Sequence, residues 1–252
     1  MPEKAIAVMK RYELKYIVSA EQRAFLESAL EGHMKIDKYG ITSIASLYYD
    51  TLDYRLIRNS IEKPPFKEKI RLRSYGIATD DSPVFLELKR KYDGVVYKRR
   101  VQSTIPVVES FFRRDGDIAA DGQIAREIAY FRDFYGTLVP ACLIVYDRAA
   151  YYEPGGDLRL TLDGNPRYRI DQLDLKTSME GTSLLPEGYS ILEIKVQLAM
   201  PLWLTHILDE GKIYRASFSK YGEAYKTQAI RLFQERKSNL WTPSSTPSSP
   251  NP

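Results

Sequence analysis

Alternation of apolar and charged residues is the strongest pattern along the chain. In residues 10–18 the apolar residues Tyr12, Leu14, Tyr16 and Val18 lie on one side, and Arg11, Glu13 and Lys15 lie on the other. Such alternation predicts a β-strand with one apolar face and one charged face. Related patterns predict further strands at residues 41–50, 66–75, 84–91, 95–104, 143–152, 157–163 and 189–197.

Helical spacing replaces alternation in the segments between these strands. Ser19 stands three residues before Gln22, which is the spacing of a capping box, and an apolar stripe follows that ends near Gly32. Further helices are predicted at residues 54–62, in two segments after residue 104, of which the second covers 123–135, and at 201–208 and 219–236.

The charged faces of the strands are mostly basic. A half-buried sheet with solvated outer faces would also alternate, but such faces normally mix both signs of charge with Ser, Thr and Gln. The apolar stripes of the helices need a surface to cover, and the aliphatic strand faces are the available one. We therefore expect a closed antiparallel β-barrel (α+β class) whose lumen holds Lys15, Lys69, Arg71, Arg73, Lys89, Lys98, Arg100, Arg148, Arg159 and Lys195.

Length and composition narrow the picture. The 252 residues are enough for one barrel domain with its helices, expected over 1–237, and the Ser- and Pro-rich residues 238–252 are expected to be a disordered tail. The net charge of +4 is too small for a protein that coats nucleic acid.

The chain lacks an apolar run of ~20 residues and an apolar leader, so we expect a cytoplasmic protein without a membrane segment. The single cysteine, Cys142, is expected in the core, and His33 and His206 are interpreted as structural.

A lumen rich in guanidinium and ammonium groups would repel itself when empty, which points to a multivalent anion as its ligand. Arginine forks and lysine point charges both suit phosphate oxygens, and the chain lacks a glycine-rich phosphate loop.

Glu193 stands in phase with Lys195, where a divalent cation would need an oxygen ligand, although an ion-pair role is the alternative. Glu13 and Glu87 are weaker candidates. Ser219 is placed to cap the last helix beside Lys220, as a phosphate site or as a plain surface cap.

Several short motifs, taken in order, resemble a known family. They are Arg11-Tyr-Glu-Leu-Lys15, Arg71-Leu-Arg73, Leu86-Glu-Leu-Lys89, Tyr146-Asp-Arg148, Leu158-Arg159-Leu-Thr-Leu-Asp163, Leu192-Glu193-Ile-Lys195 and Phe218-Ser-Lys220. Together they resemble the vacuolar-transporter-chaperone (VTC) polyphosphate polymerase domain of the triphosphate tunnel metalloenzymes, over about residues 8–236. The resemblance implies an eight-stranded antiparallel tunnel in which a nucleoside triphosphate, a metal and a growing polyphosphate chain meet.

The resemblance and the basic faces together imply roles for individual residues. The residues expected to align the triphosphate during catalysis are Lys15, Arg71, Arg73, Lys89, Arg148 and Arg159. Further phosphate contacts are expected from Lys98, Arg100, Tyr146, Lys195, Ser219 and Lys220. Glu193 is the expected ligand of Mn²⁺ or Mg²⁺.

Related tunnel hydrolases and cyclases usually begin with an E-x-E-x-K strand, and here Arg11 occupies the first glutamate position. This departure favours a polymerase that transfers the γ-phosphate of ATP to inorganic polyphosphate. Two alternatives remain at this point: a tripolyphosphatase or nucleoside triphosphatase, and a module that binds polyphosphate without turnover. ATP and polyphosphate are the expected partners, nucleic acid is not, and a separate membrane partner is left open.

Overall fold

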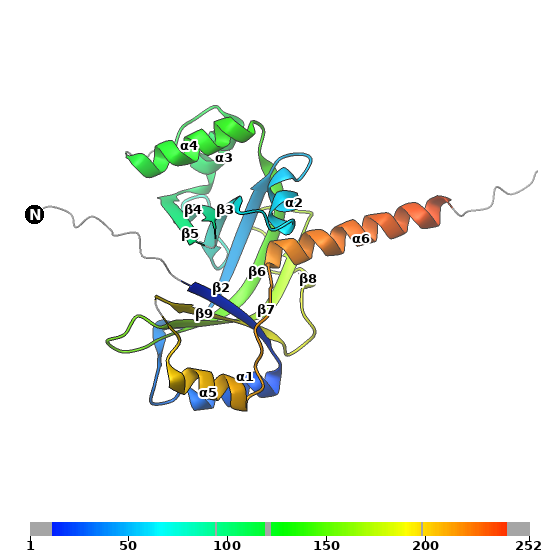
Figure 1. Cartoon of the computed structure of the whole chain (residues 1–252). Coiled ribbons are helices and arrows are strands. Elements are labelled where there is room, and N and C mark those ends of the chain that lie inside the picture. The colour runs from blue at the N-terminus through cyan, green and yellow to red at the C-terminus, as the bar shows by residue number, and fades with distance from the viewer. Residues whose placement is uncertain (1–11, 94, 119–121, 198, 241–252) are drawn as a thin grey trace, which may run out of the picture.

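The computed structural model describes residues 12–93, 95–118, 122–197 and 199–240. Nine strands and six helices follow one another in these residues (Figure 1). In chain order they are β1 (Tyr12–Val18), α1 (Ala20–Ala29), β2 (Lys35–Asp50), α2 (Arg55–Ile61), β3 (Phe66–Tyr75), β4 (Val84–Tyr92), β5 (Val95–Ser103), α3 (Ile105–Arg113), α4 (Gln123–Tyr135), β6 (Val139–Tyr152), β7 (Arg159–Arg169), β8 (Thr182–Ser183), β9 (Ser190–Val196), α5 (Leu202–Glu210) and α6 (Lys220–Leu240).

The strands form one antiparallel sheet in the order β1-β9-β7-β6-β2-β3-β4-β5, and the short β8 pairs with β7. The long strands β2, β6 and β7 run between two lobes, one built on β3, β4 and β5 and the other on β1 and β9 (Figure 1). The sheet therefore curls, and its two ends turn toward each other on one side.

The predicted closure of the barrel is not confirmed. In the described residues, backbone pairing joins β1 only to β9 and β5 only to β4, apart from a single bridge from Tyr16 to Arg215. A barrel closes only where the backbone of the last strand bonds that of the first. Instead, a side-chain ion pair joins Lys89 of β4, the strand beside the end strand β5, to Glu13 of the end strand β1.

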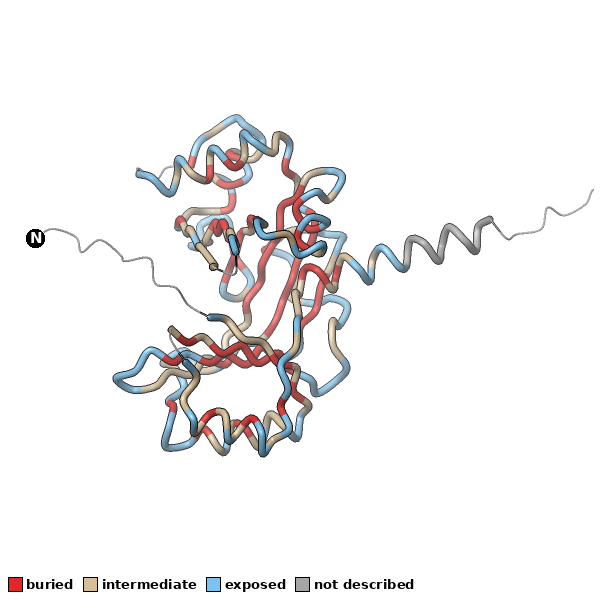
Figure 2. The backbone as a smooth tube through the Cα atoms, viewed as in Figure 1, coloured by how far each residue is buried: buried red, intermediate tan, exposed pale blue. Residues whose placement is uncertain are grey.

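Two apolar cores lie on the outer face of the sheet, as the sequence predicted. Helices α3 and α4 cover β2 to β5, where Leu72 and Leu86 pack with Phe111 and Phe131. Helices α1 and α5 cover β1, β7 and β9, where Leu160 is fully buried. The apolar residues of these strands are buried against the helices, and buried stretches follow the central strands (Figure 2). Residues that alternate with them, among them Arg71 and Glu87, lie on the opposite, inner face.

A third apolar cluster closes part of the inner face. Tyr48 of β2 and Tyr146 of β6 pack there with Ile57 of α2 and with Tyr221 and Ala224 of α6. Helix α6 begins at this cluster and then projects away from the body (Figure 1). The first turn of α6 is therefore fixed beside the charged inner face.

The element boundaries follow the predicted ones with a few corrections. Strand β7 continues to Arg169 and β2 begins at Lys35, because these ends are held by partner strands that local pattern does not reveal. Helix α6 runs to Leu240, past the start of the predicted tail, and residues 241–252 lie outside the described part. Lys10, Arg11 and Gly94 also lie outside it, so the structure does not test the predictions made on them.

Two local predictions are confirmed, those of a capping box at Ser19 and of a buried Cys142. The capping box of Ser19 and Gln22 forms at the start of α1. Cys142 is buried, and burial raises the pKa of its thiol. His33 stacks on Trp203 with their ring centroids 4.3 Å apart. No helix within the described ranges combines the length and the apolar character needed to cross a bilayer.

Candidate functional site

The centre of the inner face is a buried carboxylate surrounded by cations, which we call the Glu87 cluster: Glu87, Arg71, Arg73, Lys98 and Arg100. Glu87 of β4 is only 1% exposed. Its Oε2 accepts a 2.9 Å hydrogen bond from Arg71 Nε, and its Oε1 lies 2.7 Å from both Lys98 Nζ and Arg100 Nε. Arg73 Nε lies 3.7 Å from Oε2. Cross-strand register creates the cluster, because Arg71, Glu87 and Arg100 are directly opposite one another on β3, β4 and β5.

The electrostatics of this cluster leave an excess of positive charge. Burial would raise the pKa of Glu87, but Arg71 and Arg73 beside it hold that pKa far below its ordinary value. Glu87 is therefore ionised at neutral pH, yet one carboxylate cannot neutralise the four cations within reach. Such an imbalance at a partly enclosed surface favours a bound anion.

Tyrosine hydroxyls connect the cluster to the long central strands. Arg71 Nη1 donates to Tyr48 Oη of β2 at 2.9 Å, and Arg73 Nη2 donates to Tyr146 Oη of β6 at 3.1 Å. Arg73 is itself 5% exposed. These contacts fix the direction of both guanidinium groups, so each retains a defined set of N–H donors for a ligand.

A second ion-pair group lies on β6, β7 and the start of α6. Asp163 of β7 is fully buried and accepts two hydrogen bonds from Arg148, at 2.6 and 2.8 Å. Lys220 Nζ bonds to the same carboxylate. Burial raises the pKa of Asp163, but Lys220 and Arg148 outweigh that effect and bring it to about 2. The pair fixes Arg148 in a single orientation on the inner face.

A pair of carboxylates lies opposite the Glu87 cluster, on the neighbouring strands β1 and β9. Glu193 is 6% exposed, with Lys195 Nζ at 2.7 Å and Lys15 Nζ at 3.5 Å. The Glu13 carboxyl lies close enough to form a hydrogen bond with that of Glu193. Burial would raise the pKa of Glu193, but Lys195 and Lys15 hold it well below its ordinary value. Both strands therefore direct acidic oxygens to one point.

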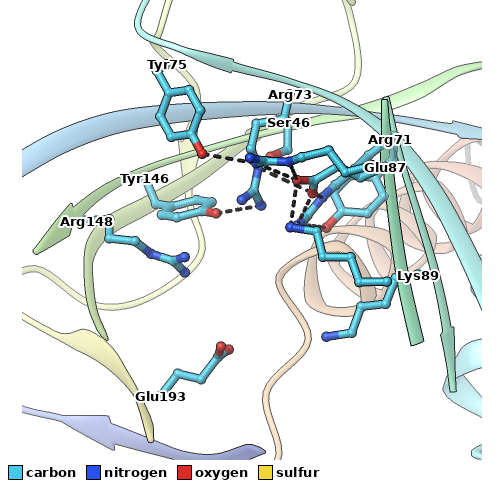
Figure 3. Close-up of polar contacts among 12 residues, drawn as sticks. Ser46, Arg71, Arg73, Tyr75, Glu87, Lys89, Tyr146, Arg148 and Glu193 are labelled. Carbon is cyan, nitrogen blue, oxygen red and sulfur yellow. Dashed lines mark hydrogen bonds and ion pairs between the residues drawn. The ribbon is translucent and has the colours of Figure 1, made fainter. Parts of the chain in front are cut away.

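These groups face a common space. Arg148, Glu193 and Lys89 point from three different strands into the region beside the Glu87 cluster (Figure 3). The charges of Glu193 and Lys89 act on one another, and that of Glu193 also acts on Arg148. The inner face is thus one continuous electrostatic environment.

The start of α6 supplies further polar groups to this face. Ser219 caps the helix, since its Oγ accepts the backbone N–H of Gly222 at 3.2 Å, and it also accepts a 3.0 Å hydrogen bond from Lys69 Nζ. Tyr221 stacks on Tyr48 with centroids 4.7 Å apart and donates a 2.9 Å hydrogen bond to the buried Asp50. This anchor holds the helix N-terminus, a favourable environment for phosphate, at the inner face.

The structure brings most of the predicted residues together. Those on the shared inner face are Lys15, Arg71, Arg73, Lys89, Lys98, Arg100, Tyr146, Arg148, Glu193, Lys195, Ser219 and Lys220. Arg159, directly opposite Lys195 in the register of β7 and β9, lies at the edge of this face. It is exposed at the first residue of β7, where its Nη1 donates to the carbonyls of Gly156 and Leu158 and its guanidinium lies over the Tyr152 ring.

The residue roles themselves remain predictions, and sequence reasoning gave no role to several groups that the structure adds. Asp163 orients Arg148 and Lys220, Tyr48 orients Arg71, and Lys69 contacts Ser219. Alternation had already placed Lys69 on the basic face. Tyr48 gave no such signal, because a tyrosine in an apolar run is indistinguishable from core without the fold.

Comparison with known proteins identifies relatives of the chain. A family model described as the VTC domain matches residues 10–229. Subunit 4 of the vacuolar transporter chaperone complex of Schizosaccharomyces pombe is 25% identical over 247 residues, covering 80% of this chain. The match covers 33% of that relative, so this chain corresponds to about a third of its length.

A solved structure shows a similar fold. A proposed adenylate cyclase from Bacillus halodurans has a TM-score of 0.51 at 16% identity, covering 84% of this chain and 96% of its own. A second proposed adenylate cyclase, from Vibrio parahaemolyticus, has a TM-score of 0.48 at 11% identity, covering 87% of this chain and 99% of its own. At 16% identity the Bacillus likeness concerns the fold alone.

Proposed function

The chain belongs to the VTC domain family of triphosphate tunnel proteins, and on that premise we propose that it is a polyphosphate polymerase. In this reaction the γ-phosphoryl group of ATP is transferred to the end of an inorganic polyphosphate chain with the help of Mn²⁺ or Mg²⁺. The observation that carries the proposal is the position of Glu193, a buried carboxylate that faces the Arg71 and Arg73 end of a strongly basic surface (Figure 3). The relative named as a vacuolar transporter chaperone subunit supports the same reading.

The acidic oxygens at this point suit a divalent cation. Glu13 and Glu193 converge from adjacent strands, and the described residues hold no third acidic, His or Cys group that would complete an all-protein metal cage. Mg²⁺ is commonly held by one or two carboxylates together with substrate phosphates. Glu193, with Glu13 beside it, would hold the cation, which when bound neutralises charge on the phosphate oxygens.

The residues of the chain provide position and charge. Phosphoryl transfer has a loose transition state, so alignment and charge neutralisation supply most of the catalysis. We assign the alignment of the triphosphate to Arg71, Arg73 and Arg148, whose directions are fixed by Tyr48, Tyr146 and Asp163. The terminal phosphate of the acceptor chain attacks the γ-phosphorus, a P–O bond forms there, and the bond to ADP breaks. The attacking oxygen is already anionic, so no protein base is required.

The lysines favour a phosphate acceptor over water. Lys15, Lys89 and Lys195 lie around the two carboxylates and are placed to hold the acceptor chain next to the γ-phosphate. Such retention raises the effective concentration of the chain end far above what diffusion would supply.

The test is product analysis. The purified protein, incubated with ATP and Mn²⁺, is expected to form chains that run as a ladder on a gel, with inorganic phosphate as a minor product. Rapid release of phosphate without chains would instead make it a hydrolase. Tight binding of polyphosphate without either product would make it a binding module.

A further inference from the structure

Four lysines form two adjacent cross-strand pairs on β3 and β4. Lys67 is directly opposite Lys91, and Lys69 is directly opposite Lys89. We call them the lysine quartet. Like charges that face each other across a sheet destabilise it, since their Cβ atoms lie only about 5 Å apart. Two such pairs in succession call for a compensating charge.

The quartet lies on the inner face, in line with the Glu87 cluster. The residues that alternate with it point the other way, since Glu68 bonds to Arg90 and to Tyr135 of α4 on the outer side. Along β3 the inner residues run Lys67, Lys69 and Arg71, a span of about 14 Å at about 3.4 Å per residue. The lysines thus extend the basic surface from its centre toward the start of β3.

Protein carboxylates compensate only one member of the quartet. Lys89 pairs with Glu13 at 3.0 Å. Within the described part of the chain, Lys67, Lys69 and Lys91 have no ion pair. Lys67 Nζ contacts the Ser60 carbonyl at 3.4 Å and Lys69 Nζ contacts Ser219 Oγ at 3.0 Å, and both partners are neutral.

The pKa values of Lys67 and Lys69 are lowered, as expected for amines that have no opposite charge nearby. Burial and the charges of Lys89 and Lys15 lower the pKa of Lys69 to about 7. Burial and Lys91 also lower the pKa of Lys67. An ordinary solvated basic face would leave both amines near their usual values, because water and salt screen exposed charges.

We propose that the lysine quartet is a polyanion subsite that adjoins the reaction centre at Lys89 and holds successive phosphates of the polyphosphate chain as it leaves that centre. The idea rests on the proposed function for the identity of the polyanion. It adds Lys67, Lys69 and Lys91 to the binding residues and gives the chain a direction, from Arg71 toward the start of β3.

The chemistry of the two basic groups supports a division of labour. Arginine forks bind phosphate in a fixed, bidentate geometry, which suits a triphosphate that must be aligned. Lysine ammonium groups are flexible point charges without a preferred orientation. A row of them can bind any phosphate of a uniform chain equally, so that the chain advances by one unit without losing its contacts.

The experiment compares ligands of different length. In a Lys67→Gln/Lys91→Gln double variant of the full chain, we expect the affinity for long-chain inorganic polyphosphate to fall at least tenfold. The slope of log affinity against log salt should become shallower by about two, because about one counterion is released for each lysine contact. Tripolyphosphate, held at the Glu87 cluster, should bind within about twofold of wild type.

A matched control separates local contacts from net charge. Lys176→Gln/Lys226→Gln removes the same charge from two exposed lysines that pair with Asp80 and Glu223, away from the inner face. It should leave both affinities unchanged. Thermal melting of each variant verifies that it folds.

The possible outcomes separate a failure of the proposed subsite from a failure of the proposed polymerase activity. Unchanged affinity for the long chain, equal losses for both ligands, or an equal loss in the control would overturn the subsite. None of these results bears on whether ATP yields chains. Conversely, selective loss of long-chain binding in a protein that makes no polyphosphate would sustain the subsite and refute the polymerase.

Discussion

Lys89 Nζ lies 3.0 Å from the Glu13 carboxylate, and this ion pair connects β4 to β1, strands far apart in the order of the sheet. Both side chains retain some solvent contact, with 40% and 19% of their areas exposed. The contact reaches between the two ends of the sheet, and it places a cation of the quartet beside the proposed metal-binding carboxylates.

We expect this pair to contribute modestly to stability. A double-mutant cycle on Lys89→Gln and Glu13→Gln should give a coupling energy of about 0.5–1 kcal/mol, the range of partly exposed pairs. Denaturant unfolding measures it, and the coupling should shrink at high salt. A coupling of zero at low salt would show that the two ends of the sheet are not held together in this way.

Glu87→Gln should destabilise the protein by about 3 kcal/mol, because it removes the buried carboxylate that pairs with Arg71, Arg73, Lys98 and Arg100. Tripolyphosphate should restore much of the loss, since the bound anion replaces the missing charge. Thermal melting with and without the ligand measures both effects. Glu187→Gln, at an exposed position, is the control. A variant as stable as wild type without ligand would contradict the described cluster.

Glu193→Gln should reduce metal-dependent turnover at least a hundredfold while the fold persists, because the change removes charge but little volume. Polyphosphate binding should largely survive, since the basic residues remain. Activity across a Mn²⁺ titration measures the effect, and Glu13→Gln should shift the titration to higher metal concentration. Wild-type activity of Glu193→Gln at every metal concentration would move the metal site elsewhere.

Anion affinity should fall as pH rises, because two lysines of the inner face have lowered pKa values. The pKa of Lys69 is lowered to about 7 and that of Lys98 to about 8. A bound anion favours the protonated amines and raises their pKa values. Between about pH 8 and pH 10 the free protein has lost these protons and must take them up on binding, so affinity falls by up to about tenfold per pH unit for each proton. Calorimetry with tripolyphosphate measures this slope.

The stability of the free protein should change in the opposite direction over the same range. A lysine whose folded pKa lies below its unfolded value binds fewer protons in the folded state, so the free energy of unfolding rises between about pH 7 and 10.5. Lys69→Gln should flatten both dependences, and Lys176→Gln should flatten neither. Parallel pH profiles for wild type and Lys69→Gln would show that Lys69 does not titrate here.

The sequence by itself determined the strands, the helices and the sign of the inner face. Alternation is a local property, so it placed Lys69, Arg71 and Arg73 on one side of β3 without knowledge of any partner. The helical stripes then required an apolar surface to cover, and the outward direction of Leu72 and Leu160 followed. The ordered motifs also identified the family that the comparison confirmed.

Only the tertiary structure decided which charges meet. The register of β3, β4 and β5 set Glu87 among its cations, and the register of β1 and β9 set Glu13 beside Glu193. Arg159 shows the limit of local pattern, since it shares the alternation of β7 but lies at the end of the strand and bonds to its own turn. The openness of the sheet depends on backbone pairing between strands distant in sequence, which no local pattern encodes. The sign of a charge is set by the residue type. Whether that charge is neutralised depends on its distance from an opposite charge, and only folding fixes that distance.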